Sequence, residues 1–295
     1  EGSGVQVTYY RIDDYENQTY SGPFNLSEEG YHNITYWSVD NASNVENPKT
    51  LSVYVDNSPP TIGNITIVPS YESKGTLYIS GTSDIYAEVT DEGSGVASCE
   101  YTLDGGSNWT SATYDSQNNL CKAENIDTSG ATSIKFRAID YLGNSNESSA
   151  VKVTPDTQAP TISISGNSSN WVNTNQTALI SCEDGDGESG CNLSTLGYKL
   201  YDSNPGTCPD SASEYTLGNS VEISSHKWVC AYGEDNVGNS ATAGPVEFKV
   251  DKMIPTISDD YLYDGIWVNS NQTVNLTPSD EGGSGIKEVR YCEGE

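Results

Sequence analysis

The sequence predicts an all-β protein made of tandem β-sandwiches joined end to end. Three observations predict this fold. A set of landmarks recurs in fixed order, short alternating apolar and polar runs appear every ~8–12 residues between Gly, Asn, Asp and Ser turns, and helix signals are nearly absent. Self-similarity at a fixed period indicates an array of like domains, whereas catalysis usually shows one unrepeated constellation.

Three landmarks define the repeat. The first is an acidic Gly-Ser-Gly turn, at residues 1–4, 91–95, 280–285 and, in a looser form, 188–190. The second is Asp-x-x-x-Asn, at residues 40–44, 140–144 and 235–239. The third is an Asp four residues before Pro-Thr-Ile, at positions 56, 156 and 251. The second and third landmarks are always 16 residues apart, and successive third landmarks are 100 and then 95 residues apart.

The phase of the repeat gives the domain boundaries. Residues 56–155 and 156–250 each hold a complete module, and a chain of 295 residues has room for about three domains of ordinary size. Residues 1–55 begin at the acidic turn, so they form a partial domain whose front is missing. Residues 251–295 stop soon after the next acidic turn and form a partial domain whose back is missing. We read the chain as an excerpt of a longer repeat protein.

Alternation within the runs places one face of each strand in a core. Before the second landmark, the apolar positions of two modules align: Ile34, Tyr36 and Ser38 with Ile134, Phe136 and Ala138. The intervening Lys135 and Arg137 are charged, so this strand has one buried face and one solvent-exposed face. Before the third landmark the matching positions are Leu51, Val53 and Val55, then Val151 and Val153, then Val246, Phe248 and Val250.

The tryptophans are expected to anchor cores or loops. Trp171-Val172-Asn173 and Trp267-Val268-Asn269 recur at the same place in two modules, which favours packing over a binding site. Trp109, in the module between 56 and 155, has no such counterpart.

The charge excludes two classes of partner. A net charge of −29 with only 13 Lys and Arg argues against nucleic-acid binding, because phosphate contacts need cations. The same sign disfavours anionic membranes. No apolar run approaches the ~18 residues of a membrane span, so we expect no direct membrane insertion in this segment. An acidic surface does suit cation binding and solubility.

We expect an extracellular protein at the cell surface that carries N-linked glycans. Asn-x-Ser/Thr sequons mark glycosylation sites where a chain meets the machinery. They occur at Asn17, Asn25, Asn33, Asn41, Asn64, Asn108, Asn146, Asn167, Asn175, Asn192, Asn271 and Asn275. The alternative is that a polar β-protein collects sequons through its composition alone. None occurs at residues 197–265, where we would look for a protein contact.

Seven cysteines in an exported chain imply disulfides. Cys182 lies on the strand before the acidic turn and Cys230 on the strand before Asp235. In an immunoglobulin-like sandwich these are the facing strands B and F, so we expect a bond between the two cysteines. That leaves Cys191 to pair with Cys208. A bond between Cys182 and Cys191 would contradict this strand placement.

The remaining cysteines give one further bridge and one odd residue. Cys99 follows its acidic turn and Cys121 lies further on, so we expect a local loop closed by these two. Cys292 occupies nearly the same place as Cys99 in its own module and has no downstream partner. Zinc is disfavoured, because the sequence has no Cys-x-x-Cys pair and only two His.

Residues 5–56 resemble a known class of module. The stretches at residues 9–13, 20–24, 29–34 and 39–46 are similar to the bacterial and archaeal immunoglobulin-like repeats of cell-surface proteins, of the OmpL47-like or Big type. The chain departs from that pattern at Ser43, where Gly is expected, and in its extra cysteines. The resemblance implies tandem immunoglobulin-like β-sandwiches joined end to end, used as stalks, adhesins or surface-layer parts. It names no ligand, because such folds host many functions.

The acidic landmarks predict calcium at the domain junctions. If the acidic turn is the B–C loop and Asp-x-x-x-Asn the F–G loop, both lie at the end of the domain where the third landmark starts. The three predicted sets are Asp56, Asp91, Glu92 and Asp140; Asp156, Asp184, Asp186, Glu188 and Asp235; and Asp251, Asp280 and Glu281. Clustered carboxylates suit a hard cation that takes six to eight oxygen ligands.

Within these sets, Asp184, Asp186 and Glu188 are the best single site. The alternative is that Gly, Asn and Asp serve only as turn residues, because Gly and Asn tolerate positive φ and Asp caps its own turn.

We expect no enzymatic activity. A Ser-His-Asp arrangement would need His32 or His226, which lie in alternating runs of different modules with no nucleophile elbow nearby. We interpret His32 as a strand-edge residue. Acidic pairs suited to glycoside hydrolysis repeat in every module, which indicates structure.

The function we predict is an extracellular structural repeat region of a surface protein, which forms or supports a filament, surface layer or adhesin stalk. Its partners would be further immunoglobulin-like modules of the same protein, in a homopolymer if the modules assemble. The alternative is a set of carbohydrate-binding accessory modules of a secreted enzyme. Exposed aromatic residues clustered on one module would favour that alternative, with Trp109, Trp171 and Trp267 as candidates.

Overall fold

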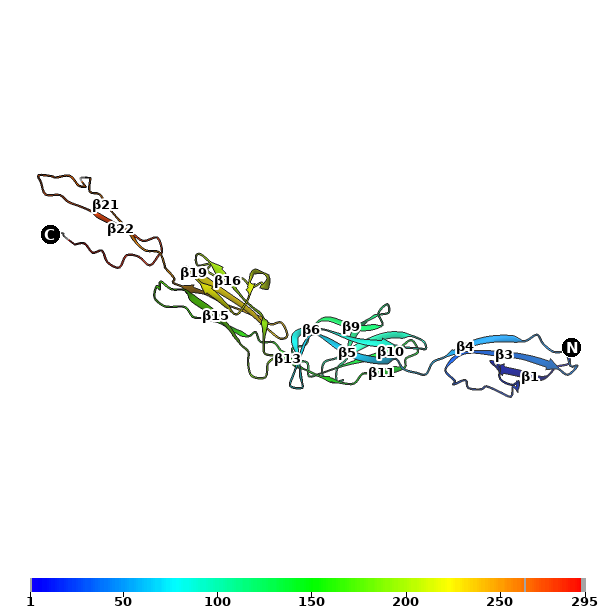
Figure 1. The fold of residues 1–295 in the computed structure, drawn as a ribbon. Coiled ribbons are helices and arrows are strands. Elements are labelled where there is room, and N and C mark those ends of the chain that lie inside the picture. The colour runs from blue at the N-terminus through cyan, green and yellow to red at the C-terminus, as the bar shows by residue number, and fades with distance from the viewer. Residues whose placement is uncertain (1, 263, 293–295) are drawn as a thin grey trace. The chain divides into compact units, whose positions relative to one another are not determined.

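The computed structural model describes residues 2–262 and 264–292, and it is all-β, as predicted. Apart from one 3₁₀ turn at Ala212–Glu214, every element in the described part of the chain is a strand. The strands form tandem sheets within residues 5–55, 61–156, 161–248 and 256–279 (Figure 1).

Residues 5–55 form a four-stranded antiparallel sheet. Its strands are β1 (Val5–Ile12), β2 (Gln18–Thr19), β3 (Gly30–Asp40) and β4 (Lys49–Val55), in the order β2-β1-β3-β4. On one face Tyr10 stacks on Phe24 with ring centroids 4.2 Å apart, beside Ile34 and Leu51. The other face carries a second set of aromatic rings, described below.

His32 lies in β3, an inner strand of this sheet, so its expected place at a strand edge is wrong. Its ring is buried, with Nδ1 2.7 Å from Asp13 Oδ2 and Nε2 2.8 Å from the carbonyl oxygen of Glu28. The hydrogen bond to Asp13 raises the pKa of His32 above its usual range. Both ring nitrogens of His32 therefore bond loop residues beside the sheet, Asp13 after β1 and Glu28 before β3.

Residues 61–156 form a second, larger sheet. Its strands are β5 (Thr61–Ser73), β6 (Thr76–Thr90), β7 (Val96–Thr102), β8 (Thr110–Asp115), β9 (Leu120–Asp127), β10 (Ser133–Asp140), β11 (Ser145–Glu147), β12 (Val151–Lys152) and β13 (Thr154–Asp156). The order is β11-β10-β7-β8-β9-β6-β13, with β12 on β10 and β5 on β6.

The predicted alternation along β10 is confirmed. Ile134, Phe136 and Ala138 are fully buried, while Lys135 and Arg137 point outward and pair with Glu147 and Glu100.

Residues 161–248 form two sheets that pack as a sandwich. One sheet has the order β14-β15-β18 and the other β17-β16-β19-β20. The strands are β14 (Thr161–Ser165), β15 (Gln176–Glu183), β16 (Cys191–Tyr201), β17 (Thr216–Leu217), β18 (Ser220–Ile223), β19 (Lys227–Asp235) and β20 (Ser240–Phe248). The core between them includes Ala178, Ile223, Val229, Phe248 and Val250. The strands assigned as B and F, β15 and β19, do lie in opposite sheets.

The structure corrects two of the three expected disulfides. Cys99 is bonded to Cys121, as predicted. The expected bonds from Cys182 to Cys230 and from Cys191 to Cys208 are wrong. The bonds that form join Cys182 to Cys191 and Cys208 to Cys230.

Strand alternation explains the correction. Cys230 stands between Val229 and Ala231, which both face the core, so its side chain points away from β15. Cys182 is the penultimate residue of β15 and Cys191 is the first residue of β16, so the acidic turn itself brings these two together. The bond between Cys182 and Cys191 is therefore compatible with the predicted strands, contrary to our expectation.

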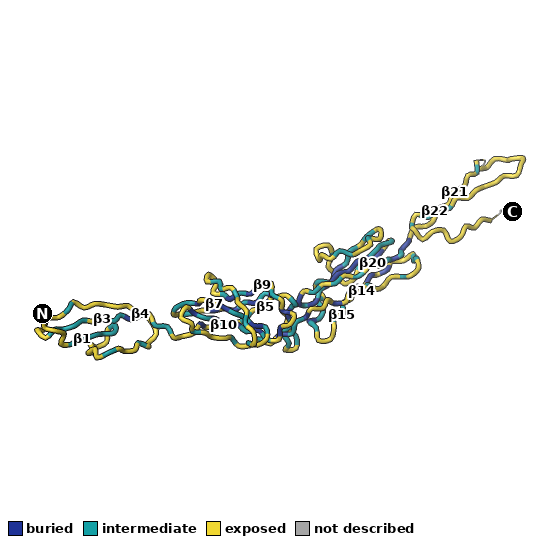
Figure 2. The backbone as a smooth tube through the Cα atoms, turned by 180° about the vertical axis from the view of Figure 1, so that it is seen from behind, coloured by how far each residue is buried: buried dark blue, intermediate teal, exposed yellow. Residues whose placement is uncertain are grey.

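Residues 256–279 contribute a two-stranded sheet of β21 (Thr256–Asp259) and β22 (Leu276–Ser279). Trp267 is fully exposed there, so packing does not explain it, whereas Trp171 lies 4.9 Å from the ring of His226. Cys292 is exposed and unbonded. Buried positions gather in the sheets between β5 and β20, and the first and last segments are mostly intermediate or exposed (Figure 2).

Candidate metal centre

The Asp of the third landmark is bonded to the acidic turn of the module that it begins. One carboxylate oxygen accepts a hydrogen bond from the backbone N–H of the Ser in the turn. The bond joins Asp56 to Ser94 at 2.6 Å, Asp156 to Ser189 at 2.7 Å and Asp251 to Ser284 at 3.0 Å. We call this bond the linker clamp. It occurs at all three copies of the third landmark.

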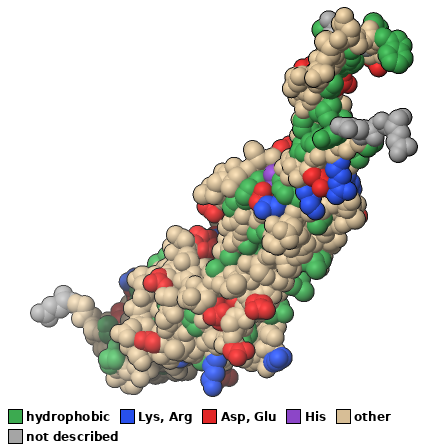
Figure 3. Space-filling view, turned by 90° about the vertical axis from the view of Figure 1, so that its left-hand side faces the viewer, with side chains coloured by type: hydrophobic (Ala, Val, Ile, Leu, Met, Phe, Trp, Pro, Cys, Tyr) green, Lys and Arg blue, Asp and Glu red, His purple; other side chains and the backbone are tan. Residues whose placement is uncertain are grey.

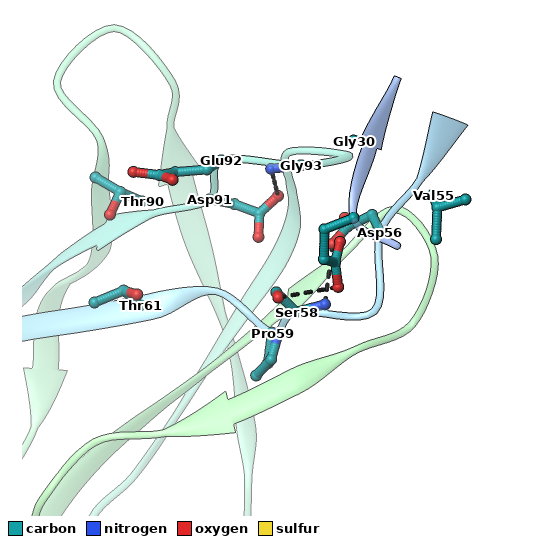
Figure 4. Close-up of a pocket in the computed structure, with 11 residues that line it drawn as sticks. Gly30, Val55, Asp56, Ser58, Pro59, Thr61, Thr90, Asp91, Glu92 and Gly93 are labelled. Atoms are coloured by element: carbon teal, nitrogen blue, oxygen red, sulfur yellow. Dashed lines mark hydrogen bonds between the residues drawn. The ribbon is translucent and has the colours of Figure 1, made fainter. Parts of the chain in front are cut away.

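The glycine before Ser94 makes room for the clamp. A Cβ built on Gly93 would lie 2.3 Å from Asp56 Cγ, and one built on Gly282 would lie 1.7 Å from Asp251 Oδ1. In these two turns the glycine is required by the close approach of a carboxylate, whereas in the second module the clamp forms with Glu188 before Ser189. Figure 4 shows Asp56, Asp91 and Gly93 around the same pocket, with the Gly93 N–H bonded to the Asp91 carboxylate.

The acidic turn is closed by its own first Asp. In the three turns that begin with Asp, an Oδ2 atom accepts from the backbone N–H of the last Gly: Asp91 from Gly95 at 2.6 Å, Asp184 from Gly190 at 2.7 Å and Asp280 from Gly285 at 2.6 Å. The two residues are 4, 6 and 5 positions apart, so the turn keeps its bond although its length changes.

The Asp-x-x-x-Asn landmark closes the F–G loop and also reaches the linker. Asp140 accepts from the backbone N–H groups of Leu142 and Asn144, each at 2.8 Å, and from the Asn144 side chain. The same Asn144 Nδ2 donates to the carbonyl oxygen of Asp56 at 3.2 Å. Asp235 and Asn239 repeat this pattern, with Asn239 Nδ2 3.1 Å from the carbonyl oxygen of Asp156.

Two groups of three carboxylates result. The first group is Asp56, Asp91 and Asp140, and the second is Asp156, Asp184 and Asp235. In each group one oxygen of every residue lies within 4.8 Å of the others. Each group takes one Asp from each landmark, so the three landmarks meet at one place.

The other predicted ligands lie outside these groups. Glu92 and Asp186 belong to neither, and Glu188 accepts from the Gly185 N–H at 2.7 Å. The second group therefore uses Asp156 and Asp235 where the sequence favoured Asp186 and Glu188. Among the described residues, Asp251, Asp280 and Glu281 do not form a three-carboxylate group.

Three of the six carboxylates are buried and three are half-buried, and none has a cationic partner among the described residues. Asp140, Asp156 and Asp235 are at most 2% exposed, and no ion pair among the described residues includes any of the six. Burying a charge is costly unless it is paired or hydrogen-bonded. Hydrogen bonds from backbone N–H groups to the carboxylates offset part of that cost in both groups.

The two groups differ in their acidity. In the first, the N–H of Ser94 lowers the pKa of Asp56. Burial acts to raise the pKa of Asp140, but the hydrogen bonds from Asn144 and its loop outweigh it and lower this pKa. In the second, burial raises the pKa of both Asp184 and Asp235, and the neighbouring Glu188 adds to the effect on Asp184.

Some buried oxygens near these groups have no donor. Asp184 Oδ1, Ser94 Oγ and Ser189 Oγ are buried and have no hydrogen-bond partner within residues 2–262 and 264–292. Ser94 and Ser189 are two of the three clamp serines, and the hydroxyl of the third, Ser284, donates to Asp280 Oδ2 at 3.2 Å. Carboxylate and hydroxyl oxygens grouped around buried negative charge fit a hard cation such as Ca²⁺.

No family model matches this chain, and no curated protein matches it. Among solved structures it is similar to the Ca²⁺-stabilised adhesin that helps an Antarctic bacterium reach out and bind ice. The identity is 17% and the TM-score 0.35, over 88% of this chain and 68% of that chain. It is also similar to the fibronectin(III)-like modules of Clostridium thermocellum CbhA, at 17% identity and a TM-score of 0.33, over 63% and 93% of the two chains.

A third similar structure belongs to a 1.5-MDa bacterial ice-binding adhesin. The identity is 13% and the TM-score 0.35, over 83% of this chain and 85% of that chain.

Proposed function

We propose that this chain is an extracellular structural repeat region of a surface protein, which forms or supports a filament, surface layer or adhesin stalk. The linker clamp carries the proposal. It fixes the first residue of a module to that module's acidic turn at Asp56, Asp156 and Asp251. A device repeated at every module start suits an array that spans distance, because each copy does the same mechanical task.

The disulfides and the net charge support a location outside the cytoplasm. Three disulfides persist only in an oxidising compartment. The net charge of −29 favours solubility, and Figure 3 shows acidic side chains scattered over the face in view. No helix in the described part of the chain has the length and hydropathy of a membrane span.

Calcium is the cofactor we propose for the two carboxylate groups. An ion at Asp156, Asp184 and Asp235 would relieve the repulsion between buried carboxylates and give Asp184 Oδ1 a partner. Because Asp156 is the first residue of its module, the ion would strengthen the clamp on the linker.

Calorimetric titration of the full chain with CaCl₂ tests the cofactor. We expect D184N to weaken binding about tenfold or more at one site, because it removes a ligand charge, and D186N to leave it unchanged. Asp186 lies in the same turn but outside the carboxylate group. Equal losses in the two variants, or no binding at millimolar calcium, would refute the site.

Electron microscopy of native, cell-derived material without chelator tests the structural role. Filaments, sheets or thin beaded stalks, with a repeat of a few domains, would support it. If the chain occurs only as part of a compact enzyme, the structural role is wrong and the accessory-module alternative replaces it.

A further inference from the structure

One face of the first sheet carries two pairs of aromatic rings. The ring centroids of Tyr9 and Trp37 are 5.8 Å apart, and those of Tyr31 and Tyr54 are 5.0 Å apart. Strand register places Tyr9 opposite Trp37 and Tyr31 opposite Tyr54, so alternation puts both pairs on one side. We call this side the aromatic face.

The aromatic face is the outer side of the sheet. Its β3 positions alternate with Ile34 and Tyr36, whose counterparts Ile134 and Phe136 are fully buried in β10. The apolar pocket of this sheet, lined by Tyr10, Tyr20, Phe24, Ile34, Tyr36 and Leu51, lies on that opposite, core-type side. Trp37 and its neighbours therefore correspond to the wet side of β10.

The matching outer faces of the other modules are covered by their own side chains. Arg137 lies 4.5 Å above the ring of Trp109, and Tyr232 is 5% exposed beneath Tyr215. On the aromatic face, by contrast, Tyr31 is 49% exposed and Tyr54 78% exposed. Tyr9 and Trp37 are half-buried, and no comparable side chain covers Tyr31 or Tyr54 in the described part of the chain.

Hydrogen-bonding groups lie between the two ring pairs. Asn33 Oδ1 accepts from the Tyr31 hydroxyl at 2.7 Å and from Ser52 Oγ at 2.9 Å, which leaves the Asn33 amide NH₂ available. Arg11 lies opposite Thr35, and its Nε is buried with no hydrogen-bond partner among the described residues. Trp37 and Tyr31 are six residues apart on β3, a span of about 20 Å.

We propose that the aromatic face binds an uncharged polysaccharide, an activity beyond the structural role proposed above. Sugar rings present apolar C–H faces that pack on Tyr and Trp, and their hydroxyls match the amide and hydroxyl groups between the ring pairs. A span of about 20 Å lets one extended glycan reach both pairs. The polymer is neutral because a chain of net charge −29 repels polyanions.

The test is retention of the full chain on insoluble polysaccharides, made in a host without N-glycosylation because Asn33 is itself a sequon. The panel is cellulose, xylan, mannan and chitin, with affinity from depletion isotherms. We expect binding to at least one member and a loss of about tenfold or more for Y54A, since one stacked ring is removed. The control is Y141A, which removes a 72% exposed ring from another part of the chain.

W37A removes a ring of the other pair and is tested in the same retention assay. Circular dichroism confirms that the fold is retained. The proposal is overturned by failure to bind any of the four polymers, or by equal binding of wild type and Y54A. It is also overturned if Y54A abolishes self-association in sedimentation without changing retention, because the face is then a contact between copies. None of these outcomes bears on the linker clamp.

Discussion

The two carboxylate groups are built from the same landmarks and the same bonds, yet they differ in acidity. In the first, Asp56 and Asp140 have a lowered pKa, because backbone and Asn donors stabilise their charge. In the second, Asp184 and Asp235 have a raised pKa, chiefly because of burial. The same hydrogen-bond pattern can thus accompany a lowered or a raised carboxyl pKa, depending on how much water and negative charge surround the group.

The longer acidic turn adds to the effect of burial at Asp184. Asp184 and Gly190 are six residues apart, against four for Asp91 and Gly95, and the added length brings Glu188 beside Asp184. The bond between Cys182 and Cys191 closes this turn at its base. The carboxylates of the second group therefore repel one another more strongly, and a disulfide closes their turn. We infer that this disulfide and a bound cation offset the repulsion.

Reduction of the disulfides should produce the largest difference in stability between residues 56–155 and residues 156–250. The bonds Cys99–Cys121 and Cys208–Cys230 both span 22 residues, and Cys182–Cys191 spans 9. Chain entropy gives about 3 kcal/mol for each long bridge and about 2.5 kcal/mol for the short one. Hydrogen exchange of the reduced full chain should show the greater loss of stability at residues 156–250. The double variant C182S/C191S isolates the short bridge, and equal losses in both modules would contradict the prediction.

Calcium should stabilise the second module more than the first. A ligand at one hundred times its Kd adds about 2.7 kcal/mol to the free energy of unfolding. We expect that gain in the hydrogen-exchange protection of residues 156–250, and a smaller one at 56–155, because only the second group holds carboxylates with a raised pKa. D235N should remove the gain. A larger effect at 56–155 would reverse our ranking of the two groups.

Substitution of Gly93 by Ala should break the first linker clamp. The new Cβ would meet Asp56 Cγ at 2.3 Å, so the carboxylate must move out of the turn. We expect a loss of about 1–3 kcal/mol in that module, as for other overpacked sites, measured by urea unfolding. The matched control is G130A, in the same module, where nothing lies within 4 Å of the added Cβ. Comparable losses for G93A and G130A would mean that the clamp contributes little.

The repeat made the convergence of the landmarks predictable, because loop positions in a β-sandwich follow from strand order. The alternation along β10 and the placement of β15 and β19 in opposite sheets follow from period-two patterning. Two of the three disulfides did not follow, because they depend on one position in β19. Cys230 points outward while Val229 and Ala231 point inward, and strand assignment alone does not distinguish them.

The ranking of ligands within a predicted set was beyond sequence reasoning. The set around Asp184 included Asp156 and Asp235, but spacing favoured Asp186 and Glu188, whereas the fold brings Asp156 and Asp235 to Asp184. The aromatic face was missed because Tyr31 and Tyr54 become neighbours only through the pairing of β3 with β4.

The pH dependence of the calcium-free chain should have opposite sign in the two modules, with a smaller magnitude than the effects above. Asp184 and Asp235 have folded pKa values above their ordinary 3.8, so protonation relieves repulsion. Residues 156–250 should then gain stability as pH falls from 7 towards 4. Asp56 and Asp140 have lowered values, so their contribution is present above pH 3.8 and is lost as pH falls below it.

Hydrogen exchange in EDTA, corrected for the intrinsic effect of pH on exchange, measures both modules in one sample. Calcium should reverse the trend at residues 156–250, because protons then compete with the ion for Asp184 and Asp235. Parallel pH profiles in the two modules, with or without calcium, would show that the difference in burial between the groups has no energetic consequence.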